Sequence, residues 1–190
     1  MTGLVLLGIV AAVIATAVAI YNRLVRLKNG SESAWSDIDV QLKRRHNLVD
    51  NLVETVKGYM QHERSTLDAV VQARSQATAA RGGGSARESG IAEGLLGQQI
   101  RTLFALAEAY PDLKASEGFA NLHRSLEQLE SDIQNARRYY NAVVRDLNTR
   151  VQSVPDTFVA RMFNFQEREF FELEDQAQAA VPKVDFGTGS

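Results

Sequence analysis

The 190-residue chain contains no cysteine, only three prolines and three histidines, and a formal net charge of −2. Without cysteine it forms no disulfides, thiolate metal sites or thiol nucleophiles. The scarcity of proline leaves long segments in which a helix can continue without interruption. A net charge this close to zero argues against a general nucleic-acid-binding protein, which usually carries a basic excess or stripe. These absences direct attention to the apolar residues, which are unevenly distributed along the chain.

The longest uncharged stretch lies at the N-terminus, from Thr2 to Asn22. A hydrocarbon core about 30 Å thick is crossed by about 20 apolar helical residues, so this stretch is long enough to span a bilayer. Backbone amides in lipid must be satisfied within the segment, which requires a helix. A cleaved signal peptide is the alternative, because the small residues at 17–19 resemble a cleavage site. The missing basic n-region and the length of the apolar run favour a retained transmembrane helix over residues 1–22.

Basic residues follow the apolar stretch directly, in a juxtamembrane segment of residues 23–30. They are Arg23, Arg26 and Lys28, whereas only the amino terminus precedes the span. The positive-inside rule therefore predicts that the N-terminus lies outside and that the rest of the chain is cytoplasmic.

From Trp35 onward, apolar residues recur at alternating steps of three and four, which is typical of long amphipathic helices that pack on one another. Residues 31–80 contain no proline, and the pattern predicts one helix of about 50 residues. Whether the membrane helix is continuous with it is left open by the break signal at Asn29-Gly30. Further helices are expected over residues 91–110, 116–154 and 156–179.

Glycine is concentrated in residues 82–90 (GGGSARESG). Three successive glycines are expected to end a helix and open a flexible linker, whereas a phosphate-binding loop would need a GxxxxGK[ST] pattern after a strand. Strand-like alternation is absent from the whole sequence. The fold class predicted is all-α, with an N-terminal transmembrane helix followed by an antiparallel bundle of long helices over residues 31–181. Residues 182–190 are expected to form a flexible tail.

Several stretches of the sequence resemble the LemA family. They are YNRLVRLKN, AWSDIDVQLKRRHNLVDNLVETVKGYMQHE, ALAEAYPDLKA, ARRYYNAVVRDLN and FNFQEREFFELED, and the resemblance runs in order from Tyr21 to Phe186. It implies a bacterial helical protein anchored in the inner membrane, with the N-terminus outside and the soluble domain cytoplasmic. It implies no established catalytic activity, so it indicates a family more closely than a function.

The residues themselves supply no catalytic or metal-binding motif. His62-Glu63 begins like a zinc-binding HExxH sequence, but Thr66 occupies the position of the second histidine. Di-metal helical bundles use Glu-x-x-His pairs, and none of the three histidines has an acidic residue three positions before it. We therefore predict no catalytic residues, no metal, no cofactor and no enzymatic activity.

A basic run at residues 43–45 and an acidic run at residues 167–175 lie far apart in the sequence. Nucleic-acid binding is not expected, because the basic run lacks a second strip and interleaved aromatic residues. The two runs are either separate solvated faces or the halves of a clamp, within one chain or between subunits. We predict a clamp between subunits, because complementary charge selects the register of an interface. The candidate contacts are Lys43, Arg44, Arg45, Glu167, Glu169 and Glu172.

The leading functional hypothesis is a non-enzymatic, single-pass membrane scaffold that self-associates through its helical domain. The expected partners are further copies in a homo-oligomer, for which a cyclic arrangement is favoured, together with the lipid bilayer and another membrane protein. Small residues four apart in the span, such as Gly8 and Ala12, also permit close helix packing. The alternative is an adaptor or regulator of a membrane protease or signalling system, acting as a monomer or small oligomer.

Overall fold

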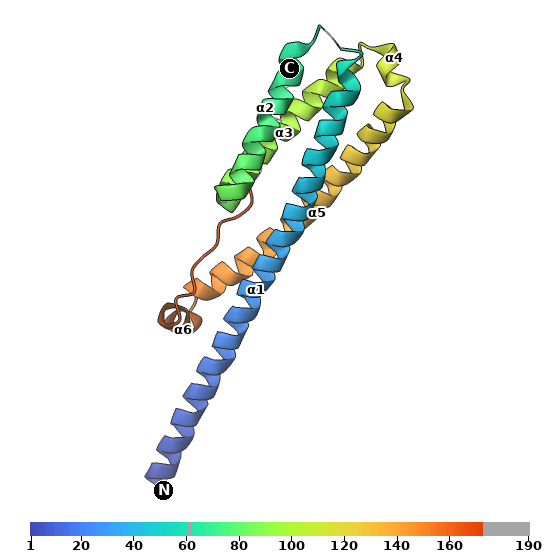
Figure 1. Cartoon of the computed structure of the whole chain (residues 1–190). Coiled ribbons are helices and arrows are strands. Elements are labelled where there is room, and N and C mark those ends of the chain that lie inside the picture. The colour runs from blue at the N-terminus through green and yellow to red at the C-terminus, as the bar shows by residue number, and fades with distance from the viewer. Residues whose placement is uncertain (61, 173–190) are drawn as a thin grey trace, which may run out of the picture.

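The computed structural model describes residues 1–60 and 62–172, which form helices and connecting segments with no strand among them. Figure 1 shows a long first helix that projects far beyond a bundle made by the other helices. This confirms the predicted all-α class and the predicted apolar N-terminal helix. The elements are α1 (Thr2–Lys57), α2 (Arg64–Gly83), α3 (Ala86–Ala107), α4 (Pro111–Lys114), α5 (Glu117–Gln152) and α6 (Asp156–Met162).

Helix α1 is continuous from the apolar segment into the bundle. Asn29 and Gly30, which suggested a break, are both helical. The hydroxyl of Ser31 donates a hydrogen bond to the carbonyl of Lys28 at 2.7 Å, within the same helix. Gly30 faces α5, and a Cβ at this position would lie 3.6 Å from the side chain of Val143. The break signal is therefore overridden by packing against α5.

The predicted helix over residues 31–80 is interrupted in the structure. Helix α1 ends at Lys57, and α2 begins at Arg64 after a short turn. Gly58 disfavours helix continuation, and Met60 is fully buried in the turn. The apolar spacing continues across the turn because both helices face the same core, so periodicity alone could not reveal the reversal.

The glycine-rich segment is a tight corner rather than the flexible linker predicted. Helix α2 extends to Gly83 and α3 begins at Ala86, five residues earlier than expected. Ser85 caps α3, accepting a hydrogen bond from the Glu88 amide at 3.3 Å, while the Glu88 carboxylate accepts one from the Ser85 amide at 2.9 Å. This reciprocal capping box satisfies amide groups that a helix start would otherwise leave free.

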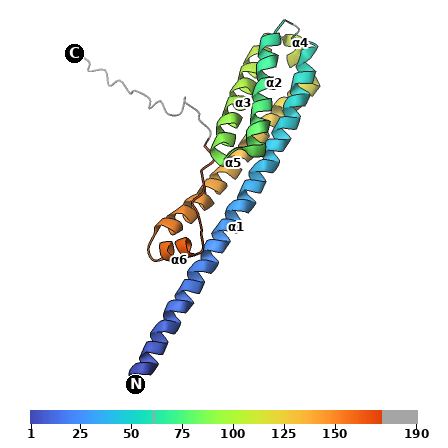
Figure 2. The same cartoon turned by 60° about the vertical axis from the view of Figure 1, so that its left-hand side comes forward.

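The part of the bundle furthest from the N-terminus contains four antiparallel helices. The chain runs away from the N-terminus along α1, returns along α2, and repeats this path with α3 and α5 (Figures 1 and 2). Helix α1 packs mainly on α5, and α2 packs mainly on α3. Their shared core includes Leu52, Leu67, Leu103 and Leu126, one from each helix.

Closer to the N-terminus, an extended segment takes the place of α2 and α3. Residues 163–172, which we call the strap, follow α6 and return along the bundle without helical structure (Figure 1). Phe171 of the strap is fully buried in a core shared with α1 and α5. The helix predicted over residues 156–179 is therefore correct only for α6 and wrong for the strap. Residues 173–179, the acidic positions 174 and 175 and the predicted tail at 182–190 lie outside the described residues.

Candidate functional site

Two asparagines of α5 hold the strap by its backbone. The Asn148 side chain accepts a hydrogen bond from the Arg168 amide at 2.9 Å and donates one to the Arg168 carbonyl at 2.8 Å. Asn141 makes the same pair of bonds to Phe171, at 2.9 and 3.1 Å. Asn141 and Asn148 are seven residues apart, so they lie on one face of α5 at a separation of two turns. They satisfy backbone groups of a segment that has no sheet partner.

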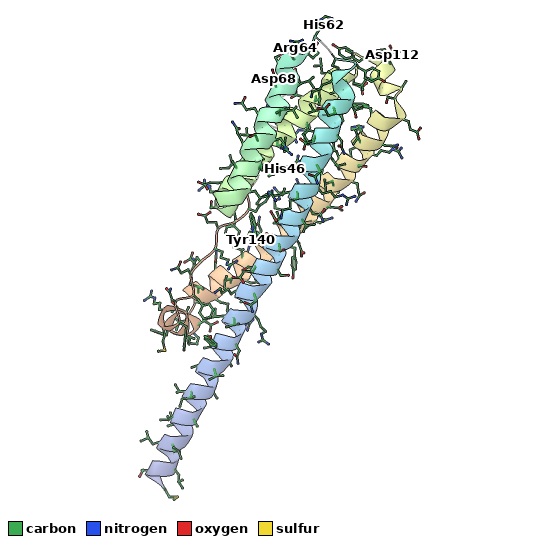
Figure 3. The ribbon with its side chains drawn as sticks, viewed as in Figure 1. His46, His62, Arg64, Asp68, Asp112 and Tyr140 are labelled. Carbon is green, nitrogen blue, oxygen red and sulfur yellow. The ribbon has the colours of Figure 1, made fainter. Side chains whose placement is uncertain are left out.

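Two further contacts join the strap to the neighbouring helices. The Tyr140 hydroxyl donates a hydrogen bond to the Glu169 carbonyl at 3.0 Å, and burial raises the pKa of Tyr140 above its usual value. Tyr140 belongs to the core shared by α1, α5 and Phe171 of the strap, and Figure 3 labels it where these segments come together. Arg168 forms an ion pair with Glu32 of α1 at 2.6 Å. The strap therefore connects α5 to α1 between α6 and the corner that joins α2 to α3.

A cluster of four charged side chains, of which all but Glu130 are buried, lies between the strap and the distal core. The Nε2 atom of His46 is 2.6 Å from Glu93 Oε1. Arg45 lies 3.5 Å from the second Glu93 oxygen and 3.1 Å from Glu130. The Glu93 side chain is 0% exposed, and Arg45 and His46 are the groups that contact its carboxylate among the described residues. These four residues, which we call the ion cluster, come from α1, α3 and α5, and Figure 3 shows His46 midway along the bundle.

Thr78 of α2 approaches the other ring nitrogen of His46. The Thr78 hydroxyl lies 3.2 Å from His46 Nδ1 and donates a hydrogen bond to the Arg74 carbonyl at 2.9 Å. Arg45 lies between the carboxylates of Glu93 and Glu130, so its buried positive charge has a negative partner on each side, as burial of charge requires.

Two glycines of α3 leave room for the ion cluster and for the end of the strap. A Cβ on Gly97 would lie 2.7 Å from the Arg45 guanidinium, and a Cβ on Gly90 would lie 2.2 Å from the Glu172 carbonyl. Any larger residue at either position would displace the ion cluster or the end of the strap. Sequence reasoning did not single out these glycines, although their seven-residue spacing, which puts both on one helix face, was a signal that could have identified them.

The basic run is split by the structure. Arg45 is 5% exposed and pairs with two carboxylates of its own chain, so its guanidinium is not available to another subunit. We therefore correct the predicted contact set by removing Arg45. Lys43 and Arg44 are exposed on α1, and Lys43 pairs with Asp39 at 2.6 Å. Burial raises the pKa of Asp39, but hydrogen bonds from Lys43 and Arg81 outweigh burial and hold it below its usual value.

The acidic run occupies the strap. Glu167, Glu169 and Glu172 are exposed, and Glu172 lies 4.0 Å from Arg87 of α3. Within the described residues, no ion pair connects these three side chains with Lys43 or Arg44. Their predicted role as contacts between subunits therefore stays a prediction.

The apolar part of α1 is unpaired with any other helix for most of its length. It contains an 18-residue window with a mean hydropathy of 2.7, none of which is buried. Large exposed side chains such as Leu7 and Ile14 are typical of a surface that contacts lipid or another protein. By length and composition, α1 is a candidate membrane span. Arg23, Arg26 and Lys28 are exposed just beyond this segment.

In the described part of the chain, no group of three or more His, Asp or Glu side chains is arranged to hold a metal ion. Glu63, which follows His62 in the incomplete zinc-binding motif, accepts a hydrogen bond at 3.0 Å from the hydroxyl of Tyr110. This hydrogen bond raises the pKa of Tyr110 above its usual value.

Comparisons with known proteins find sequence similarity over nearly all of the bundle. The description of the LemA family fits residues 34–186. Magnetosome protein MamQ 2 of Paramagnetospirillum magneticum is 27% identical over 186 residues, which cover 86% of this chain and 68% of that protein. Protein LemA of Metamycoplasma hominis is 25% identical over 171 residues, which cover 88% of this chain and 73% of that protein. The matched region contains the ion cluster and the strap, and the chain belongs to the LemA family.

Proposed function

We propose that the protein is a non-enzymatic, single-pass membrane scaffold that self-associates through its helical domain. The observation that carries this proposal is the continuity of α1, which is one helix from the candidate span to Lys57 at the far end of the bundle. A bundle built on such a helix is joined to the bilayer without a flexible linker. The names of the relatives, magnetosome protein MamQ and protein LemA, specify no reaction. We place the protein in a bacterial inner membrane, with the bundle in the cytoplasm.

The exposed charges support association between copies. Arg44 and Arg124 line a shallow hollow of about 340 Å³ between α1 and α5. Glu167 and Glu169 are exposed on the strap of the same molecule, away from this hollow, and form no ion pair within the described residues. We propose that the strap carboxylates of one copy bind at the Lys43–Arg44 side of the next. A contact between two different surfaces, repeated around an axis, closes into a ring when the rotation permits.

Charge reversal tests this contact. The double variant Lys43→Glu and Arg44→Glu should reduce the mass of the detergent-extracted particle, measured by light scattering, because like charges then face each other. Adding Glu167→Arg and Glu169→Arg in the same chain should partly restore the mass.

The matched control is Lys57→Glu with Arg64→Glu, two exposed basic residues at the far end of the bundle. This control makes the same change in net charge and should leave the particle mass unchanged. A wild-type particle with the mass of a single chain would remove self-association and favour the adaptor hypothesis. A reversal variant of unchanged mass would remove this particular contact.

A further inference from the structure

We infer that the corner at residues 153–163, which follows α5 and contains α6, is a second membrane contact that inserts into the interface of the cytoplasmic leaflet. This inference rests on the proposal that α1 spans the membrane. The corner contacts the membrane beside the span, and its ligand there is a phospholipid surface.

Helix α6 lies beside the end of the uncharged segment of α1. Val159 and Ala160 of α6 form a small core with Leu24 of α1. Ala17 and Ile20, which belong to the uncharged segment of α1, pack against the same core. Ala17 precedes the first basic residue of α1 by six positions, or ~9 Å along a helix. A spanning α1 therefore holds α6 at the depth where the hydrocarbon core meets the headgroups.

The side of the corner that faces away from α1 carries large apolar side chains, as a position at the boundary between hydrocarbon core and headgroups requires. Val154, Phe158, Met162 and Phe163 are 74%, 65%, 77% and 54% exposed. Phe158 and Met162 are four residues apart and share one face of α6, whereas Val159 and Ala160 face α1. Elsewhere in the described bundle, large exposed apolar side chains are scattered singly, as at Val40, Val71 and Leu95. Four such side chains within ten residues form an apolar patch that water solvates poorly.

Aromatic and charged residues around the patch point to lipid rather than to a protein partner. The Tyr21 ring lies 4.7 Å from the Phe163 ring, measured between centroids, at the end of the apolar segment. Aromatic side chains gather at this level of membrane proteins because their rings tolerate both headgroups and acyl chains. Arg23 and Arg161 are exposed nearby, whereas the Asp156 carboxylate is buried and paired with Arg150 at 3.0 Å. Arg23 and Arg161 thus place positive charge beside the patch, which suits anionic phospholipids.

Single spin labels test the inference in the full chain, because the sequence contains no cysteine to compete for the label. Phe158→Cys and Met162→Cys place labels on the corner. Val10→Cys places one within the candidate span, and Val71→Cys is the matched exposed apolar position on α2. Each protein is reconstituted into vesicles of phosphatidylcholine and phosphatidylglycerol. Collisions are measured with oxygen, which concentrates in lipid, and with a water-soluble nickel chelate.

Labels at 158 and 162 should favour oxygen over the chelate several-fold more than the label at 71, and less than the label at 10. A preference at 158 and 162 equal to that at 71, with position 10 in lipid, would overturn the corner contact and leave the span intact. Labels at 158 and 162 shielded from both reagents would show a protein neighbour and would also overturn it. A label at 10 that collides freely with the chelate would overturn both the span and the inference.

Discussion

At the scale of single residues, the sequence locates the polar positions of the core but not their partners. Arg45 is predicted as a contact between subunits, yet it also falls on the apolar spacing of its helix, which was a signal that it faces the core. Its partner Glu93 lies on α3, and the register of α3 against α1 depends on where α2 reverses the chain. Asn141 and Asn148 are likewise predictable as core-side residues of α5, whereas their backbone partners lie in a strap that periodicity does not reveal.

The ion cluster yields a prediction about folding stability. Glu93→Leu should lower the free energy of unfolding by about 3–5 kcal/mol, because Arg45 and His46 lose the carboxylate between them. The double variant with Arg45→Met should cost less than the two single changes added together, since it also removes one uncompensated charge. Urea unfolding of the detergent-solubilised chain, followed by circular dichroism, gives all four corners of the cycle.

Glu127→Leu is the control, because Glu127 is an exposed carboxylate whose pairing with His123 should contribute little. Strict additivity in the Arg45–Glu93 cycle would show that the two side chains do not act as a pair.

At the scale of elements, the strap is one of the segments that sequence reasoning assigned wrongly, together with the α1–α2 turn and the glycine-rich corner. Its aromatic residues have spacings that fit amphipathic helices, and it contains neither glycine nor proline. The chain nevertheless leaves helical geometry at Asn164, whose φ of 56° lies in the left-handed region that asparagine tolerates. Beyond it, side-chain amides on α5 and burial of Phe171 stabilise an extended path. Local spacing cannot predict this outcome, because the competing hydrogen bonds come from a distant helix.

Releasing the strap should therefore have a local effect. Asn148→Leu leaves the amide and carbonyl of Arg168 without their partner, at a cost of about 1–3 kcal/mol. We expect faster hydrogen exchange in residues 166–172, measured by mass spectrometry, while the distal half of α5 keeps its protection.

Asn135→Leu is the matched control on the same helix, because Asn135 is exposed and bonds only to Arg138 among the described residues. Equal exchange in the strap of the two variants would contradict the assigned role of Asn148.

At the scale of the whole molecule, the chain is a rod in which the apolar N-terminal part of α1 projects beyond the other helices (Figures 1 and 2). The sequence predicts this elongation from the length of its apolar seams, and it predicts the apolar projection from composition alone. It does not predict that α6 lies beside the end of that projection. That placement depends on the length of α5 relative to α1, which is set by the position of the α1–α2 turn.

The orientation of the rod gives a prediction in cells. With the N-terminus outside, trypsin added after opening only the outer membrane should leave the bundle intact, since its exposed sites, such as Arg64, face the cytoplasm. Opening the inner membrane should permit cleavage, as followed with an antibody against the bundle. Cleavage before that step would reverse the proposed topology, and a mature N-terminus near Ile20 would identify a signal peptide instead.

The uninterrupted course of α1 has a mechanical consequence. About 35 residues of α1 follow the uncharged segment, which makes an arm of ~50 Å at 1.5 Å per residue. A change of about 10° in the tilt of the membrane half, of the kind that a thinner bilayer imposes on a span, would swing the far end of this arm by ~9 Å. If α1 spans the membrane, the turn that contains Met60 would therefore shift sideways whenever the local thickness of the bilayer changes the tilt of the span.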